Sequence, residues 1–212
     1  MRFEDRRQAG RLLGDRLAEL TPVNPLVLAL PRGGVPVGYE VARRLDCPLD
    51  VLLVRKLGVP GQPELAMGAI AEGDVVFRNP DIIRMARVTE EQFAAELEEE
   101  KVNLSKRALL YRDPQHAVDP EGRTVLIVDD GLATGATAMA AIEAVRTRGA
   151  RAVWLCVPVA PADTTALMTG LADEVVVLHA PERFVAVGAW YRRFDQTEDD
   201  EVRALLASSR LR

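Results

Sequence analysis

Residues 125–137, VLIVDDGLATGAT, constrain this chain more than any other stretch. Four apolar residues run directly into Asp129 and Asp130, and a turn of small residues then opens an alanine-rich helix. This order predicts a buried strand, two carboxylates at its carboxyl end and a helix that begins at the turn. Carboxylates there accept hydrogen bonds from sugar hydroxyls, and such a turn directs backbone N–H groups at a phosphate. The stretch therefore predicts a site that holds a ribose and its 5′-phosphate together.

Two common phosphate loops do not fit these residues. The turn is not the GxGxxG of dinucleotide-binding proteins, and it lacks the lysine of GxxxxGK[ST]. It instead resembles the phosphoribosyl-pyrophosphate (PRPP) signature of the type I phosphoribosyltransferases, which positions 125–130 and 134–137 match. Two positions depart from that pattern: Gly131 stands where an aliphatic residue is usual, and Ala133 where Ser, Thr or Asp is frequent.

The resemblance implies roles for the residues of this stretch. Asp129 and Asp130 are expected to bind the ribose hydroxyls and to contact Mg²⁺ only indirectly, through PRPP and water. The small turn and the helix start are expected to bind the 5′-phosphate through Gly131, Ala133, Thr134, Gly135, Ala136 and Thr137. Because Ala133 lacks the carboxylate that 6-oxopurine-using members have there, it resembles the adenine-using branch and argues against hypoxanthine or guanine as the acceptor.

Basic residues follow two other predicted strands. Residues 26–30 lead into Pro31-Arg32-Gly33-Gly34, and residues 50–54 lead into Arg55-Lys56. Taken alone, the first is an ordinary turn and the second is ordinary surface charge. The resemblance implies that Arg32, Gly33 and Gly34 form a pyrophosphate loop, often built around a cis peptide, and that Arg55 and Lys56 approach pyrophosphate from the root of a mobile loop.

The segment after Lys56 is rich in Gly and Pro and has no periodicity, so residues 57–72 are predicted to form a long loop that acts as a lid, followed by a small hairpin at Gly73-Asp74. Within this lid, Glu64 is a candidate for positioning or deprotonating a base. The alternative is that Glu64 is a solvent-exposed loop residue.

Apolar strands alternate with helices along the chain, which predicts an α/β fold with a parallel sheet and helices on both faces. The remaining predicted strands and helices, in chain order, cover residues 3–20 (helix), 35–45 (helix), 89–111 (the longest helix, with Thr89 as its N-cap), 136–148 (helix), 152–157 (strand), 162–171 (helix), 174–178 (strand) and 199–208 (helix). We expect one domain over residues 1–212, with a core at about 26–180 and a small hood formed by helix 3–20 and the tail 181–212. Phe184, Trp190, Tyr191 and Phe194 in that tail are candidates for stacking on a heterocyclic base.

Composition excludes several classes of protein. A net charge of −5 gives no basic field for nucleic acid, and no apolar run is long enough to span a bilayer. The opening residues alternate charged and apolar side chains, unlike a signal peptide, so a cytoplasmic protein is expected. Cys47 and Cys156 are predicted to be buried, reduced thiols, whereas His116 and His179 have no metal-ligand spacing and are predicted to be structural or solvent-facing.

The resemblance implies a phosphoribosyltransferase of a bacterial branch that transfers the 5-phosphoribosyl group of PRPP to a nitrogenous base and releases pyrophosphate. Relatives in the family are commonly homodimers. One alternative is a PRPP-sensing regulator without catalysis, against which the presence of Arg32, Arg55 and Lys56 argues. A further alternative is an α/β phosphatase or nucleotidase that uses Asp129 or Asp130 as its nucleophile.

Overall fold

The computed structural model describes residues 1–111 and 117–210. Within them, five parallel strands form one sheet in the order β2-β1-β6-β7-β8. The strands are β1 Pro25–Ala29, β2 Leu49–Val51, β6 Thr124–Val128, β7 Ala152–Val159 and β8 Glu174–His179. The predicted α/β fold with a parallel sheet is therefore confirmed.

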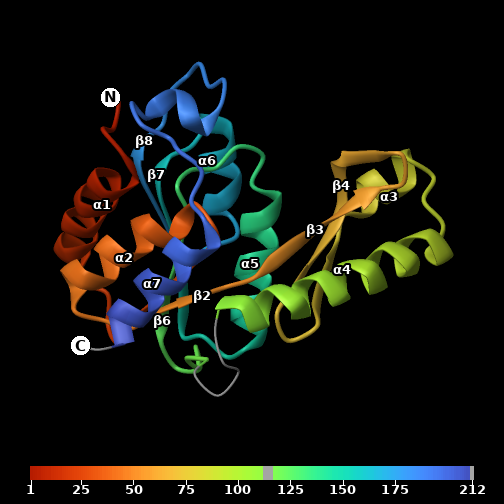
Figure 1. The fold of residues 1–212 in the computed structure, drawn as a ribbon. Helices are drawn as coiled ribbons and strands as arrows, with labels where there is room; N and C mark the ends of the chain where they lie inside the picture. The colour runs from red at the N-terminus through yellow and green to blue at the C-terminus, as the bar shows by residue number, and fades with distance from the viewer. Residues whose placement is uncertain (112–116, 211–212) are drawn as a thin grey trace.

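Helices cover both faces of this sheet, as predicted (Figure 1). One face packs against α1 Arg6–Leu20, α2 Gly34–Leu45 and α7 Asp199–Arg210, and the other against α5 Ala136–Thr147 and α6 Ala162–Thr169. Successive side chains of a strand point to opposite faces of the sheet. Leu126 and Val128 therefore pack in the core on the first face, and Val125 and Ile127 in the core on the second.

The prediction of a long irregular lid at residues 57–72 was wrong. These residues lie in β3 Val54–Val59 and β4 Gln62–Ala71, which form an antiparallel sheet with β5 Val75–Arg78. This sheet, with α3 Pro80–Met85 and α4 Glu90–Tyr111, projects from the main sheet as an arm (Figure 1). The predicted hairpin at Gly73-Asp74 is confirmed as the turn between β4 and β5.

The glycines in β3 and β4 made these two strands resemble a loop in the sequence. A Cβ added to Gly68 would lie 2.4 Å from the backbone oxygen of Phe77, and one added to Gly58 would lie 2.8 Å from Cα of Pro63. The pairing of β3 with β4 also shifts register on both sides of Gly58. These glycines therefore allow close approach of paired backbones, although in the sequence they read as loop residues.

The two ends of the chain pack together over one edge of the sheet. Phe3 pairs with Tyr191 in an isolated bridge, and the N–H of Arg192 donates to the backbone oxygen of Phe3 at 2.8 Å. A short 3₁₀ helix, η2 Val187–Trp190, precedes Tyr191. The two ends of the chain thus form a joint segment, and the hood that the sequence predicts from them stays a prediction.

Several smaller predictions have mixed outcomes. The Oγ1 atom of Thr89 accepts from the N–H of Gln92 at 3.2 Å, which confirms the predicted N-cap of α4. Both cysteines are free, and Cys156 is buried, but Cys47 is only half-buried, so its predicted full burial was wrong. His179 packs edge-on against Trp190, and His116 lies outside the described residues. None of the helices described here combines the length and apolar character needed to cross a bilayer.

Candidate active site

Asp129 and Asp130 follow β6 at the carboxyl edge of the parallel sheet, where ligands of such sheets bind. The backbone N–H of Asp130 donates to Oδ1 of Asp129 at 2.8 Å. Arg6 of α1 donates from Nε to Oδ2 of Asp130 at 2.8 Å, and the Tyr191 hydroxyl donates to the backbone oxygen of Asp130 at 2.5 Å. Both ends of the chain therefore hold the aspartate pair in place.

Arg6 is a residue of the site that the sequence did not reveal. Its guanidinium also lies 3.8 Å from the ring centroid of Phe194 and donates to the backbone oxygen of Asp195 at 2.6 Å. In the sequence Arg6 is one of many charged residues on an amphipathic helix, and no local signal distinguishes it from the others. Its contact with Asp130 joins positions 124 residues apart.

The Pro31-Arg32-Gly33-Gly34 loop lies directly against the aspartate pair. The Pro31–Arg32 peptide is cis. A Cβ on Gly33 would lie 2.1 Å from Oδ2 of Asp130, and one on Gly34 would lie 2.6 Å from the backbone oxygen of Val128. The two glycines thus let the loop touch the end of β6, and the structure brings these two sequence motifs together.

The small turn between Asp130 and α5 has two positions with tight surroundings. Gly135 has a φ of 80°, and a Cβ there would lie 2.7 Å from Cε of Met168. A Cβ on Gly131 would lie 2.6 Å from Cγ1 of Val187, so the tail packs directly against this glycine. The Thr134 and Thr137 side chains are exposed at the start of α5, where backbone N–H groups favour an anion.

Arg32 follows Pro31, which lines a narrow gap together with Arg55 and Thr137. Each of the two arginines faces carboxylates. One nitrogen of Arg32 lies 3.7 Å from Glu198 and 3.8 Å from Asp199, at the start of α7. Arg55 binds Glu100 of α4 through two contacts, of 2.5 and 3.1 Å. The hydrogen bond to Glu100 is the main cause that raises the pKa of Arg55.

Lys56 and Glu64 are not brought to the aspartate pair. Successive side chains of a strand point to opposite faces, so Lys56 points away from Arg55 and its Nζ lies 3.2 Å from Oε2 of Glu64 on β4. The Glu64 side chain is 97% exposed. In this conformation both residues belong to the outer surface of the arm.

The aromatic residues of the tail are divided between two places. Tyr191 is buried and Phe194 stacks on its ring at 5.0 Å between centroids, next to Arg6 and Asp130. Trp190 instead packs against His179, at 4.8 Å between ring centroids. Phe184 packs beside the same cluster as Phe3 and Tyr191. The rings adjacent to the aspartate pair are therefore those of Tyr191 and Phe194.

Electrostatics at the aspartate pair oppose full ionisation. Burial, followed by the neighbouring Asp130 carboxylate, raises the pKa of Asp129 well above its usual range. Burial also raises the pKa of Asp130, while Arg6 favours its charged form. Burial likewise raises the pKa of Tyr191, so its phenol remains a donor to Asp130. The pair thus holds negative charge at an energetic cost to the fold.

Asp129→Asn is therefore expected to stabilise the protein at about pH 8 and to raise its Tm by about 2–4 °C, the shift that about 1 kcal/mol gives in a chain of this size. An acid with a raised folded pKa binds more protons in the folded state, so its contribution to stability is full below the unfolded pKa and is lost as pH rises through the folded pKa. Asparagine has no such loss. The gain in Tm should shrink towards about pH 4, measured by circular dichroism. A lower Tm for the variant at about pH 8 would contradict this account.

The donor set fits a metal bound only indirectly. Within residues 1–111 and 117–210, no group of three His, Cys, Asp or Glu side chains is arranged to hold a metal ion. Oδ1 of Asp129 and Oδ2 of Asp130 each already accept a hydrogen bond. Two remaining carboxylate oxygens suit contact with a hydrated Mg²⁺ that a phosphate-bearing substrate brings with it.

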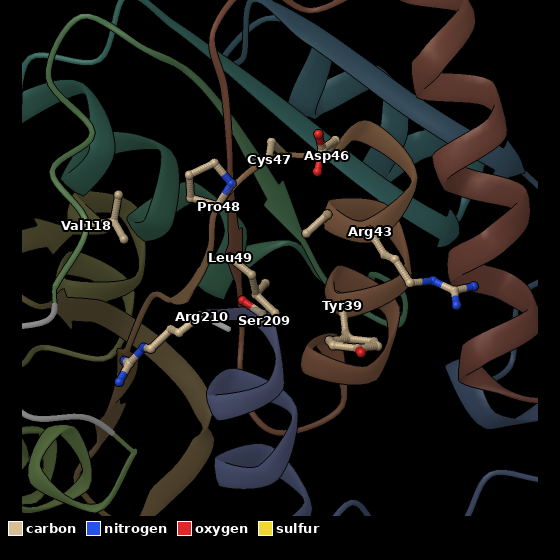
Figure 2. A pocket seen from close by; sticks show the side chains of 10 residues that line it. Tyr39, Arg43, Asp46, Cys47, Pro48, Leu49, Val118, Ser209 and Arg210 are labelled. Atoms are coloured by element: carbon tan, nitrogen blue, oxygen red, sulfur yellow. The ribbon is translucent and has the colours of Figure 1, made fainter. Parts of the chain in front are cut away.

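A separate cavity of about 560 Å³ lies away from these residues. Figure 2 shows Tyr39, Cys47, Leu49 and Arg210 on its wall, at the end of α2 and the start of β2. Because β2 begins at Leu49, this cavity lies at the amino edge of the sheet, opposite the edge that Asp129 and Asp130 occupy. Burial raises the pKa of the Cys47 thiol to about 12, which disfavours its thiolate form.

The fold and the site together define a protein of the phosphoribosyltransferase class. The sequence pattern of the phosphoribosyl transferase domain matches residues 6–188, and the chain belongs to that family. A Mycobacterium tuberculosis protein, provisionally named a phosphoribosyl transferase, is 50% identical over 204 residues, which are 96% of this chain and 46% of that protein. The chain thus spans about half the length of the curated relatives it matches.

Two further comparisons bear on the fold and on a local similarity. A crystal structure of a Thermus thermophilus protein has a TM-score of 0.87 and 45% identity, with coverage of 98% of this chain and 99% of that one. A uracil phosphoribosyltransferase of Bacillus caldolyticus is 38% identical over 82 residues, covering 34% of this chain and 39% of that enzyme.

Proposed function

We propose that this protein transfers the 5-phosphoribosyl group of PRPP to a nitrogenous base and releases pyrophosphate. One observation supports this above the others: the loop with Arg32 lies in direct contact with the aspartate pair, through Gly33 and Gly34. A ribose 5-phosphate site and a basic pyrophosphate loop are thereby adjacent. PRPP contains both a ribose 5-phosphate and a pyrophosphate, so it needs two such sites side by side.

The proposed reaction displaces pyrophosphate from C1 of the ribose by a ring nitrogen of the base. Asp129 and Asp130 bind the 2′- and 3′-hydroxyls and stabilise the positive charge that develops on the sugar. Thr134, Thr137 and the start of α5 bind the 5′-phosphate, and Arg32 binds pyrophosphate as it leaves. Holding both ends of PRPP fixes C1 relative to the incoming base.

Mg²⁺, when bound with PRPP, would neutralise part of the charge of pyrophosphate. Arg55 and Lys56 are proposed to assist at the same end of PRPP. For Lys56 this requires the arm to move towards the sheet, because its present partner is Glu64. Glu64 remains a candidate for contact with the base only after such a movement.

The acceptor is proposed to be a base other than a 6-oxopurine, since Ala133 offers no carboxylate at its position. Adenine is favoured by that position, and the local similarity to a uracil phosphoribosyltransferase makes uracil the second candidate. The test is a pyrophosphate-release assay with PRPP and a panel of purines, pyrimidines and small amines. Release that depends on one base identifies the acceptor.

The same assay separates this proposal from a PRPP-sensing regulator. A regulator would bind PRPP, seen as thermal stabilisation, with no release for any base. Arg32 and Arg55 pair with carboxylates, and these pairs have to break before either arginine binds pyrophosphate as an enzyme would require. The phosphatase alternative is disfavoured by membership of the phosphoribosyl transferase family.

We also propose that the protein acts in the cytoplasm as a homodimer, as the family resemblance implies. Sedimentation of the purified protein over a range of concentrations tests the dimer, and a single species at the monomer mass of 23.2 kDa would exclude it.

A further inference from the structure

The inward face of α4 contains an arginine among buried residues. Glu100, Leu104, Arg107 and Tyr111 follow one another at helical spacing, so they share this face. Glu100, Leu104 and Tyr111 are buried, and Arg107 is half-buried between the last two. The Arg107 side chain lines a narrow gap together with Leu30 and Leu52, which directly follow β1 and β2 of the main sheet.

Arg107 connects two hollows near the proposed pyrophosphate loop. A narrow gap of about 30 Å³ is lined by Arg107 and Arg55 together with Pro31 of that loop and Thr137 of the phosphate turn. An open cleft of about 420 Å³ is lined by the same two arginines and by Asp199. Arg107 therefore lies between the open cleft and the narrow gap, which Pro31 and Thr137 of the two proposed phosphate loops also line.

Among the described residues, the carboxylates of Glu100 and Asp199 beside this cleft lie against other arginines. Glu100 binds Arg55 through two contacts, and Asp199 lies 3.8 Å from Arg32. Arg107 lies close enough to the Tyr111 hydroxyl to oppose the rise in its pKa that burial causes, and that hydroxyl donates to Oδ1 of Asp199 at 2.5 Å. The Asp199 carboxylate thus lies between Arg32 and the Tyr111 hydroxyl, and it is the anion that pyrophosphate would displace there.

We infer that Arg107 is a ligand for the pyrophosphate group of PRPP, opposite Arg32. This inference rests on the proposed function. A guanidinium binds two phosphate oxygens at once, and pyrophosphate is the most highly charged part of PRPP. Arg107 belongs to the arm and Arg32 to the loop after β1, so the two cations would hold the leaving group from two different parts of the fold.

The test compares Arg107→Gln with wild type by isothermal titration with Mg²⁺-pyrophosphate, PRPP and ribose 5-phosphate. Loss of a charge-assisted contact is expected to weaken pyrophosphate and PRPP binding about 10–100-fold. Ribose 5-phosphate, which lacks the pyrophosphate, should bind with unchanged affinity. Arg107→Lys should recover part of the loss, because it restores the charge without the fork.

Arg84→Gln is the matched control, since it removes one positive charge from an exposed position of the same arm. It should bind all three ligands as the wild type does. Wild-type pyrophosphate affinity in Arg107→Gln would overturn the inference, as would an equal loss for ribose 5-phosphate, which would indicate a structural role. Failure of the wild-type protein to bind PRPP would instead reject the proposed function.

Discussion

Replacing Asp130 by asparagine is expected to lower the rate of pyrophosphate release about 10²–10³-fold. The substitution removes the negative charge that is proposed to stabilise the developing cation on the ribose. It keeps an oxygen that accepts the hydrogen bond from Arg6, so the geometry of the loop should persist. The measurement is the initial rate at saturating PRPP and acceptor base.

The control for Asp130→Asn is Asp81→Asn, which removes a carboxylate that is 81% exposed on α3. Both variants are compared at a temperature where circular dichroism shows that each is folded, because Arg6 loses a charged partner in the first. Turnover within about twofold of wild type for Asp130→Asn would contradict the role given to this carboxylate, since the expected loss is far larger.

Gly34→Ala is expected to lower both stability and turnover. The new Cβ would lie 2.6 Å from the backbone oxygen of Val128 and 2.9 Å from Cα of Asp129. Both neighbours are backbone atoms at the end of a buried strand, so the loop must move. Overpacking of this kind costs about 1–3 kcal/mol, which corresponds to a fall in Tm of roughly 2–12 °C. Thermal unfolding and pyrophosphate release measure the two effects.

Gly170→Ala is the matched control for that substitution. The nearest atom to its added Cβ is the backbone oxygen of Leu167, at 3.6 Å, an ordinary contact distance. Its Tm should stay within about 2 °C of wild type, because surface changes of this kind usually alter stability little. If Gly34→Ala unfolds at the wild-type temperature, the close packing of the loop on the aspartate pair is not a determinant of the fold.

Local patterns predicted the parallel sheet and its helices well because each strand is a short apolar run bounded by turns. The same patterns placed Asp129, Asp130 and the Arg32 loop at one edge, since parallel strands share their carboxyl edge. They predicted the longest helix of the arm and its turn at Gly73-Asp74, but not the strands β3 and β4. Those strands contain glycines because a neighbouring backbone passes too close for a Cβ. This close approach cannot be recognised from the sequence.

The sequence by itself determined the class of fold, the stretch 125–137 and the loop at residues 31–34, because each depends on residues adjacent in the chain. Only the tertiary structure decided that Arg6 and Tyr191 hold Asp130, that Val187 fills the space beside Gly131 and that Lys56 faces Glu64. Three of these contacts join residues more than 50 positions apart. Lys56 and Glu64 are only eight residues apart. They pair because β3 and β4 form a hairpin, which the local sequence pattern did not predict.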